Sequence, residues 1–193
     1  MNDAIERIYR VFSAYPHPRA LDGCPCCTSR QVAQPLVTKP LRALDSQDLE
    51  QYAFKALTTW GTVEDYKYFL PRIIELTVSG DLLWDIEMTL GKLAYGDFAS
   101  WPLHERQAIE DFLLDAWTDA VRSNAVEEAD ELLCGAARVM DTAPLLELAD
   151  RIDPEFRDTY RMTCSRHDKR RLRNSYWDRD SERYKAVLDW VYD

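Results

Sequence analysis

The chain has 193 residues, of which 46% are hydrophobic and 30% charged, a balance that excludes a largely disordered protein. No stretch approaches the roughly 20 consecutive apolar residues that a membrane-spanning helix needs, and acidic residues near the N-terminus with no apolar run disfavour a secretory signal. We therefore expect a cytoplasmic protein with a single helical domain over residues 1–193, whose five cysteines stay reduced.

The formal net charge of −10 is concentrated in the middle of the sequence. Residues 105–155 contain 14 acidic and four basic side chains, whereas residues 157–193 contain ten basic and seven acidic ones. An acidic centre repels nucleic acid and anionic membranes and attracts a basic protein. The alternative is that these carboxylates only keep a helical surface in solution.

The first 44 residues predict one helix followed by a long irregular segment. Ile5, Ile8 and Phe12 are spaced to share one face of a helix over residues 4–14. Residues 16–44 hold five of the nine prolines and three of the cysteines, so we expect no helix there. An irregular segment of this length needs something to hold it in place, and the cysteines are the candidates.

From residue 45 onwards the sequence predicts successive helices with recognisable ends. Asp45 or the serine after it can cap a helix over residues 45–60, and Thr62, with an aspartate three positions later, can cap the next one. Gly61, between these two helices, suits a backbone position with positive φ. Pro71 should kink or divide the second helix.

The strongest helical signal begins at Ser100 and Pro102. It is an apolar stripe on one helix face, made of Ile109, Phe112, Leu113, Ala116, Trp117, Ala120 and Val121. Further helices are expected over residues 81–96, 126–140, a short stretch after Pro144, residues 154–176 and residues 181–191. No strand or hairpin turn is indicated. The predicted fold class is therefore all-α, with antiparallel helix pairs stacked as a bundle or a short α-solenoid.

The sharpest local motif is the segment Cys24-Pro25-Cys26-Cys27. Cys24 and Cys27 have the C-x-x-C spacing that lets two thiolates bind one zinc ion. Cys164 and His167 are three residues apart on the expected helix 154–176, so they share a face and can complete a structural zinc site. Such a site would tie the N-terminal irregular segment to the C-terminal helices.

Other interpretations of these residues stay open. His17 and Cys26 are alternative zinc ligands. Without metal, the motif is a proline-stiffened loop of reduced thiols, and Cys134 and Cys164 pack as small hydrophobic side chains. Redox chemistry is a third interpretation, although the C-x-x-C spacing lacks the βαβ context of thioredoxin-like sites.

Basic residues cluster over residues 166–173 and are followed by Tyr176 and Trp177, a pattern that can hold phosphates and stack bases. Because the whole chain is acidic, we favour solvation of this cluster or pairing with the acidic residues 105–155, and we expect no nucleic-acid partner.

Catalytic motifs are also absent. There are three histidines, no glycine-rich phosphate loop, no G-x-S-x-G and no H-E-x-x-H, so we expect no enzyme activity.

Several segments recur in order in a known group of proteins: Cys24–Cys27, Tyr52–Gly61, Phe69–Leu76, Leu90–Leu93 and Trp101–Trp117. With these segments the chain resembles a poorly characterised family of small bacterial all-helical proteins with a CPCC motif. The resemblance spans residues 5–140 and leaves out the C-terminal basic segment. It implies a bacterial, cytoplasmic origin and brings no catalytic residues.

Small size, acidity, helical structure and the lack of catalytic motifs favour a non-catalytic binding protein. Within this class we favour an immunity protein that neutralises a bacterial toxin by covering its active site, because concentrated negative charge speeds the capture of a basic enzyme. The candidate partner-binding residues are Glu110, Asp111, Asp115, Asp119, Glu127, Glu128, Asp130 and Glu131, with exposed aromatic residues as anchors. The alternative is a zinc-containing regulatory protein or a metal-dependent enzyme built around Cys24–Cys27.

Overall fold

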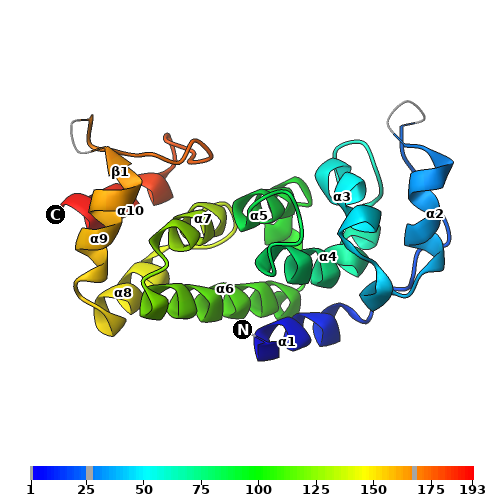
Figure 1. Cartoon of the computed structure of the whole chain (residues 1–193), viewed down its shortest axis with the longest axis horizontal. Helices are drawn as coiled ribbons and strands as arrows, with labels where there is room; N and C mark the ends of the chain where they lie inside the picture. The colour runs from blue at the N-terminus through cyan, green and yellow to red at the C-terminus, as the bar shows by residue number, and fades with distance from the viewer. Residues whose placement is uncertain (1, 25–27, 167–168) are drawn as a thin grey trace. The chain divides into compact units, whose positions relative to one another are not determined.

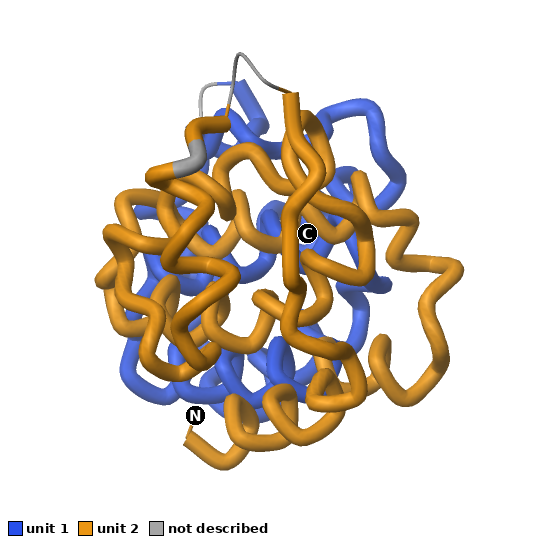
Figure 2. The backbone as a smooth tube through the Cα atoms, turned by 90° about the vertical axis from the view of Figure 1, so that its right-hand side faces the viewer, with its two compact units in different colours: residues 1, 110–193 blue, residues 2–109 orange. Residues whose placement is uncertain are grey.

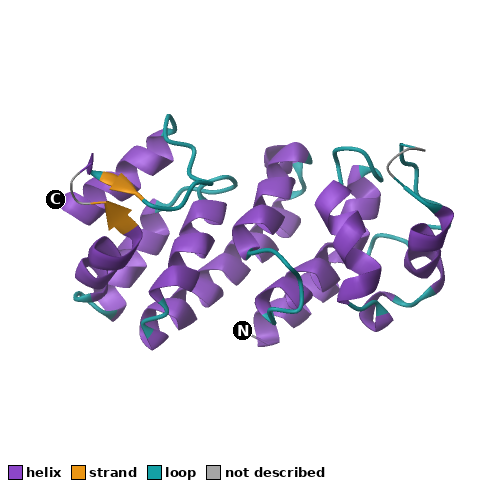
Figure 3. Cartoon of the chain, turned by 45° about the horizontal axis from the view of Figure 1, so that its top comes forward, coloured by secondary structure: helices purple, strands orange, loops and turns teal. Residues whose placement is uncertain are grey.

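The computed structural model describes residues 2–24, 28–166 and 169–193 (Figure 1). Over these residues the chain forms ten α-helices, two short 3-10 helices and one two-stranded sheet (Figure 3). The helices pack against one another, and the all-α prediction is confirmed.

The contacts divide the chain into two compact units, unit 2 over residues 2–109 and unit 1 over residues 110–193 (Figure 2). The boundary falls inside the longest helix, α6, Leu103–Ser123. The single domain over residues 1–193 stays a prediction.

Unit 2 is built around one helix. Its elements are α1 Asn2–Phe12, α2 Arg30–Thr38, η1 Leu41–Ala43, α3 Ser46–Lys55, α4 Val63–Val78, α5 Ile86–Tyr95, η2 Phe98–Ser100 and the first residues of α6. Helix α4 packs against α1, α3 and α5. Its side chains Phe69, Leu70 and Ile74 are fully buried, so α4 supplies the centre of this core.

The helix ends in unit 2 follow the expected capping chemistry. Asp45 caps α3 and Thr62 caps α4, each in a capping box with an aspartate three residues later. Gly61 has the expected positive φ of 74°. Helix α3 ends at Lys55, earlier than predicted, and α4 runs through Pro71 without a break.

The prediction of an irregular segment over residues 16–44 is wrong in part. Helix α2 and the 3-10 helix η1 both lie within it. The side chain of Ser29 caps α2 by accepting a hydrogen bond from the Val32 backbone N–H, and Leu36 is fully buried. Capping and the burial of Leu36 thus outweigh the helix-breaking effect of Pro35 within this helix.

Unit 1 contains the remainder of α6, α7 Val126–Ala136, α8 Ala143–Ile152, α9 Phe156–Cys164, β1 Ser165–Arg166, β2 Arg171–Leu172 and α10 Glu182–Tyr192. Helix α9 packs against α7, α8 and α10. The apolar stripe predicted on α6 is buried throughout, and the Trp117 indole N–H donates to the carbonyl of Leu145 at 2.7 Å. The ring of Trp117 also packs edge-on against that of Phe156.

The long basic helix predicted over residues 154–176 is wrong, as is the absence of strands. Helix α9 ends at Cys164, and β1 and β2 pair antiparallel, with Ser165 opposite Leu172. Leu172 is fully buried, and its backbone N–H donates to the Tyr184 hydroxyl of α10. Burial of Leu172 and its bond to α10 fix the hairpin, and these long-range contacts are invisible to local periodicity.

Candidate protein-binding surface

Four of the eight predicted partner-binding residues are exposed, all in unit 1. Asp115 and Asp119 lie one turn apart on α6, and Glu127 and Glu128 occupy the first turn of α7. We call these four residues the acidic set. A further three of the predicted residues are half-buried, namely Glu110, Asp111 and Glu131.

Asp130 is the exception, because it is buried inside unit 1 and faces no partner. Its carboxylate accepts hydrogen bonds from the Tyr160 hydroxyl and from the Trp177 indole N–H, the latter at 3.5 Å. Burial raises the pKa of Asp130 more than the hydrogen bonds from Tyr160, Asn174 and Trp177 lower it. Asp130 is therefore a structural residue that joins α7, α9 and the segment before α10, and its assignment to the binding surface was wrong.

Glu105, which adds to the acidic balance of residues 105–155, is also buried, in unit 2. It forms an ion pair of 2.7 Å with Lys67 and accepts a hydrogen bond of 2.5 Å from the Tyr15 hydroxyl. Lys67 also lies 4.2 Å from the ring centroid of Trp101. No local signal in the sequence reveals this ion pair, because Lys67 lies 38 positions before Glu105.

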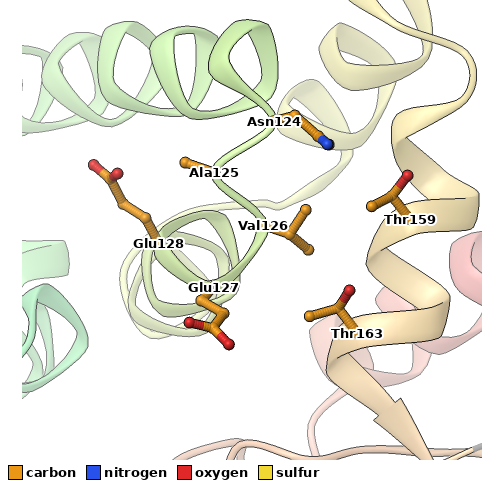
Figure 4. Close-up of a pocket in the computed structure, with 7 residues that line it drawn as sticks. All are labelled: Asn124, Ala125, Val126, Glu127, Glu128, Thr159 and Thr163. Carbon is orange, nitrogen blue, oxygen red and sulfur yellow. The ribbon is translucent and has the colours of Figure 1, made fainter.

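A pocket of about 550 Å³ opens beside the first turn of α7 (Figure 4). Its lining consists of Asn124, Ala125, Val126, Glu127, Glu128, Thr159 and Thr163. In Figure 4, Asn124 and Val126 face the two threonines of α9, while Glu128 points away from them. Asn124 has a φ of 53°, and this left-handed residue makes the tight turn from α6 into α7.

The chemistry of this pocket suits a cation. Its described lining includes two threonines, one asparagine and two glutamates, of which Glu128 points away from the threonines, and no basic residue. A lysine or arginine side chain can place its aliphatic stem against Val126 and its charged end near Glu127. The pocket therefore extends the acidic set into a concave feature that a basic side chain can enter.

The basic residues near the C-terminus pair largely within unit 1. Arg157 forms a 2.6 Å ion pair with Asp150, whose carboxylate also accepts a hydrogen bond from Trp190. Arg170 pairs with Asp193 at 3.0 Å. Arg157, which pairs with Asp150, lies outside the cluster over residues 166–173, and the ion-pair partners of Arg170, Asp189 and Asp193, lie outside residues 105–155.

Two of the four predicted zinc ligands, Cys27 and His167, lie outside the described residues. The other two belong to different units, Cys24 to unit 2 and Cys164 to unit 1. The backbone N–H of Cys24 donates to Thr59, and the carbonyl of Cys24 accepts from Thr28. Cys24 is half-buried, and these backbone hydrogen bonds hold it in place.

Cys164 is a poor zinc ligand as it stands in the structure. It is the last residue of α9, and its thiol donates to the Val126 carbonyl at 3.6 Å. Burial raises the pKa of the Cys164 thiol to about 12, which disfavours the thiolate that zinc binds. Among the residues that the structure describes, no three histidine, cysteine or acidic side chains form a metal-binding group.

Zinc binding stays a prediction, and elemental analysis of untagged protein tests it. Stoichiometric zinc after dialysis supports the prediction, and substoichiometric zinc contradicts it.

None of the helices in the described segments has the length and apolar character needed to cross a lipid bilayer. Comparisons with known proteins find no matching family model. They find no similar curated protein and no similar solved structure either. The proposals below therefore rest on the geometry and charge of the chain itself.

Proposed function

We propose that the chain is a binding protein whose acidic set captures a basic protein, and that it acts as an immunity protein by covering the active site of a bacterial toxin. The observation that carries this proposal is the exposure of four carboxylates on α6 and α7 of one unit, two of which line a pocket with no basic residue among its described lining residues. Concentrated charge of one sign steers an oppositely charged protein during diffusion and selects it over acidic competitors.

Three carboxylates of the acidic set, those of Asp115, Glu127 and Glu128, are available for such a contact. Within the described part of the chain, no basic side chain forms an ion pair with Asp115, Glu127 or Glu128. Because these side chains already lie in solvent, a partner gains their charge without breaking internal ion pairs.

The pocket beside α7 gives the partner an anchoring point. Interfaces concentrate their binding energy in a few side chains that enter well-defined pockets, and arginine is one of the residues most often used in this way. An arginine or lysine close to the active site of the toxin would fit the hydroxyl and carboxylate lining between α7 and α9. Occupation of this pocket would then bring the acidic set over the basic substrate site of the toxin.

The proposal is tested with a quadruple neutralisation, Asp115→Asn, Asp119→Asn, Glu127→Gln and Glu128→Gln. The wild type is used to isolate a binding protein from the source cell, and the purified partner is then assayed for toxicity and enzymatic activity with and without the chain. At low salt the neutralised variant should bind about ten- to a hundredfold more weakly, because it loses four favourable charges.

The matched control removes four other exposed carboxylates through Asp3→Asn, Asp22→Asn, Glu147→Gln and Glu155→Gln, with the same change in net charge. This control should bind like the wild type. Equal weakening by both variants would mean that only net charge matters, and a partner without toxic activity would contradict the immunity role.

A further inference from the structure

Unit 2 exposes large aromatic side chains where α3 and α5 end. Phe54 is 55% exposed and Tyr95 is 69% exposed. The ring of Trp84 lies 6.2 Å from that of Phe54, centroid to centroid, and Leu83 beside it in the chain is 87% exposed. We call Phe54, Trp84 and Tyr95 the aromatic patch. Exposed apolar side chains that gather in this way are typical of protein-binding sites.

A lysine stands among these rings. The ammonium nitrogen of Lys92 lies 5.9 Å from the ring centroid of Phe54 and 5.7 Å from that of Tyr95. It donates hydrogen bonds to the carbonyls of Phe54 at 2.5 Å and Ala56 at 3.2 Å. Lys92 thus ties α5 to the C-terminal end of α3 and places a cation beside the aromatic patch.

The charge of Lys92 is not neutralised within the described residues. No carboxylate forms an ion pair with it there, in contrast to Lys67, which pairs with Glu105 in the same unit. Burial lowers the pKa of Lys92, as expected for an ammonium group that loses water without gaining a carboxylate. An ammonium group has three N–H donors, and the two carbonyls use two of them.

We propose that the aromatic patch binds a segment of a protein partner in which a carboxylate is flanked by large apolar side chains. The carboxylate accepts a hydrogen bond from the Lys92 ammonium group, and the apolar side chains pack on Phe54, Trp84 and Tyr95. Charge complementarity selects this partner chemistry, because the Lys92 ammonium group lies between the rings of Phe54 and Tyr95 and forms no ion pair with a described carboxylate. The site lies in unit 2 and takes the opposite charge from the acidic set, so it does not depend on the proposed immunity function.

The probe for this site is a blocked hexapeptide, acetyl-Ser-Phe-Leu-Glu-Leu-Ser-amide, compared with its glutamine counterpart. Both are titrated into the full ¹⁵N-labelled chain, and binding is followed by chemical-shift changes. The shifts should centre on Phe54, Lys92, Tyr95 and the Trp84 indole. The glutamate peptide should bind about three- to fivefold more tightly, as a partly exposed ion pair allows.

Two variants assign the effect to its groups. Lys92→Met should remove the preference for glutamate over glutamine, and Phe54→Ser should weaken both peptides. Leu103→Ser, in the same unit with a side chain 68% exposed, is the control and should change neither. The comparison of the two peptides on the wild type needs no variant, so it holds even where loss of Lys92 unfolds the end of α3.

The proposal is overturned by equal binding of the two peptides to the wild type, by shifts that centre elsewhere, or by no binding at millimolar peptide. It is also overturned if the NMR signals of the aromatic patch shift when only the protein concentration changes, since a second copy of the chain would then occupy the patch.

Discussion

Units 1 and 2 each bury a carboxylate, and they compensate its charge in different ways. In unit 2 the carboxylate of Glu105 is paired with the ammonium of Lys67, and Tyr15 donates a hydrogen bond to the same carboxylate. In the described part of unit 1 the buried carboxylate of Asp130 is held by neutral donors, among them Tyr160 and Trp177. A buried ion pair keeps its charges over a wide pH range, whereas a carboxylate held by neutral donors retains its proton more readily.

The difference extends to neighbouring groups. In unit 2, burial lowers the pKa of Lys67, but its bonds to Glu105 and Tyr15 outweigh this and the pKa is raised. In unit 1, after burial itself, the charges of Asp130 and Glu127 add to the rise in the pKa of Cys164. Within the described residues, the buried carboxylate of unit 1 thus adds negative potential around Cys164, whereas the buried carboxylate of unit 2 is paired with a cation.

The largest effect is expected from breaking the ion pair of unit 2. Lys67→Met should lower the free energy of unfolding by about 3 kcal/mol, because it leaves a charged Glu105 buried without its cation. Chemical denaturation followed by tryptophan fluorescence measures the loss. The double variant Lys67→Met with Glu105→Leu should recover much of the stability. A single variant as stable as the wild type would show that the pair is not needed.

A smaller loss is expected in unit 1. Asp130→Leu should cost about 2 kcal/mol, because the Tyr160 hydroxyl and the Trp177 indole N–H are left buried without an acceptor. Asp130→Asn keeps an acceptor and should cost about 1 kcal/mol at neutral pH. Thermal or chemical unfolding measures the stability of the wild type, Asp130→Asn and Asp130→Leu. If Asp130→Asn were less stable than Asp130→Leu, this account of the hydrogen bonds around Asp130 would be contradicted.

The pH dependence of stability further distinguishes the carboxylate buried with neutral donors from the one buried in an ion pair. Because the folded state raises the pKa of Asp130, it binds this proton more tightly than the unfolded chain does. The wild type should therefore gain stability over Asp130→Asn as pH falls through the raised pKa, and the gain should level off below about 3.9, the pKa of an unfolded aspartate.

The contribution of Lys67 has the same sign as that of Asp130, but its window lies on the alkaline side. Its folded pKa is raised, so its stabilisation is complete below about 10.4 and is lost as pH rises further. Unfolding titrations of wild type and both variants from acid to alkaline pH measure the two windows. An Asp130 difference that did not change on the acid side would contradict the assignment.

The smallest effect concerns the Cys164 thiol. Asp130→Asn removes one negative charge near it, so the pKa of about 12 should fall and alkylation should speed up by less than about tenfold. Mass spectrometry after timed treatment with iodoacetamide measures the rate at each cysteine. Cys24, half-buried in unit 2, is the internal control, and its rate should not change.

Local chemistry was enough to predict much of the fold. Asp45 and Thr62 cap the helices that follow them, because a side-chain oxygen and a free backbone N–H a few residues later need no distant partner. The apolar stripe on α6 is equally local, since the 3.6-residue period places it on one face.

The failures share a long-range cause. The pairing of β1 with β2 depends on the burial of Leu172. It also depends on the hydrogen bond from the Leu172 backbone N–H to the hydroxyl of Tyr184, twelve residues after Leu172, and local periodicity reveals neither contact. The candidate site shows the same limit. The exposure of Asp115 and Glu128 follows from helix period, whereas the burial of Asp130 depends on Tyr160 and Trp177 from other segments.

The most direct test of the central claim is the association rate constant between the chain and its captured partner, measured by stopped-flow fluorescence over a range of ionic strength. Electrostatic steering predicts a steep fall with rising salt for the wild type and for the control with Asp3, Asp22, Glu147 and Glu155 neutralised. The variant with Asp115, Asp119, Glu127 and Glu128 neutralised should associate about tenfold more slowly at low salt, with a much flatter dependence. Indistinguishable rates and salt slopes for the two quadruple variants would contradict capture through the acidic set.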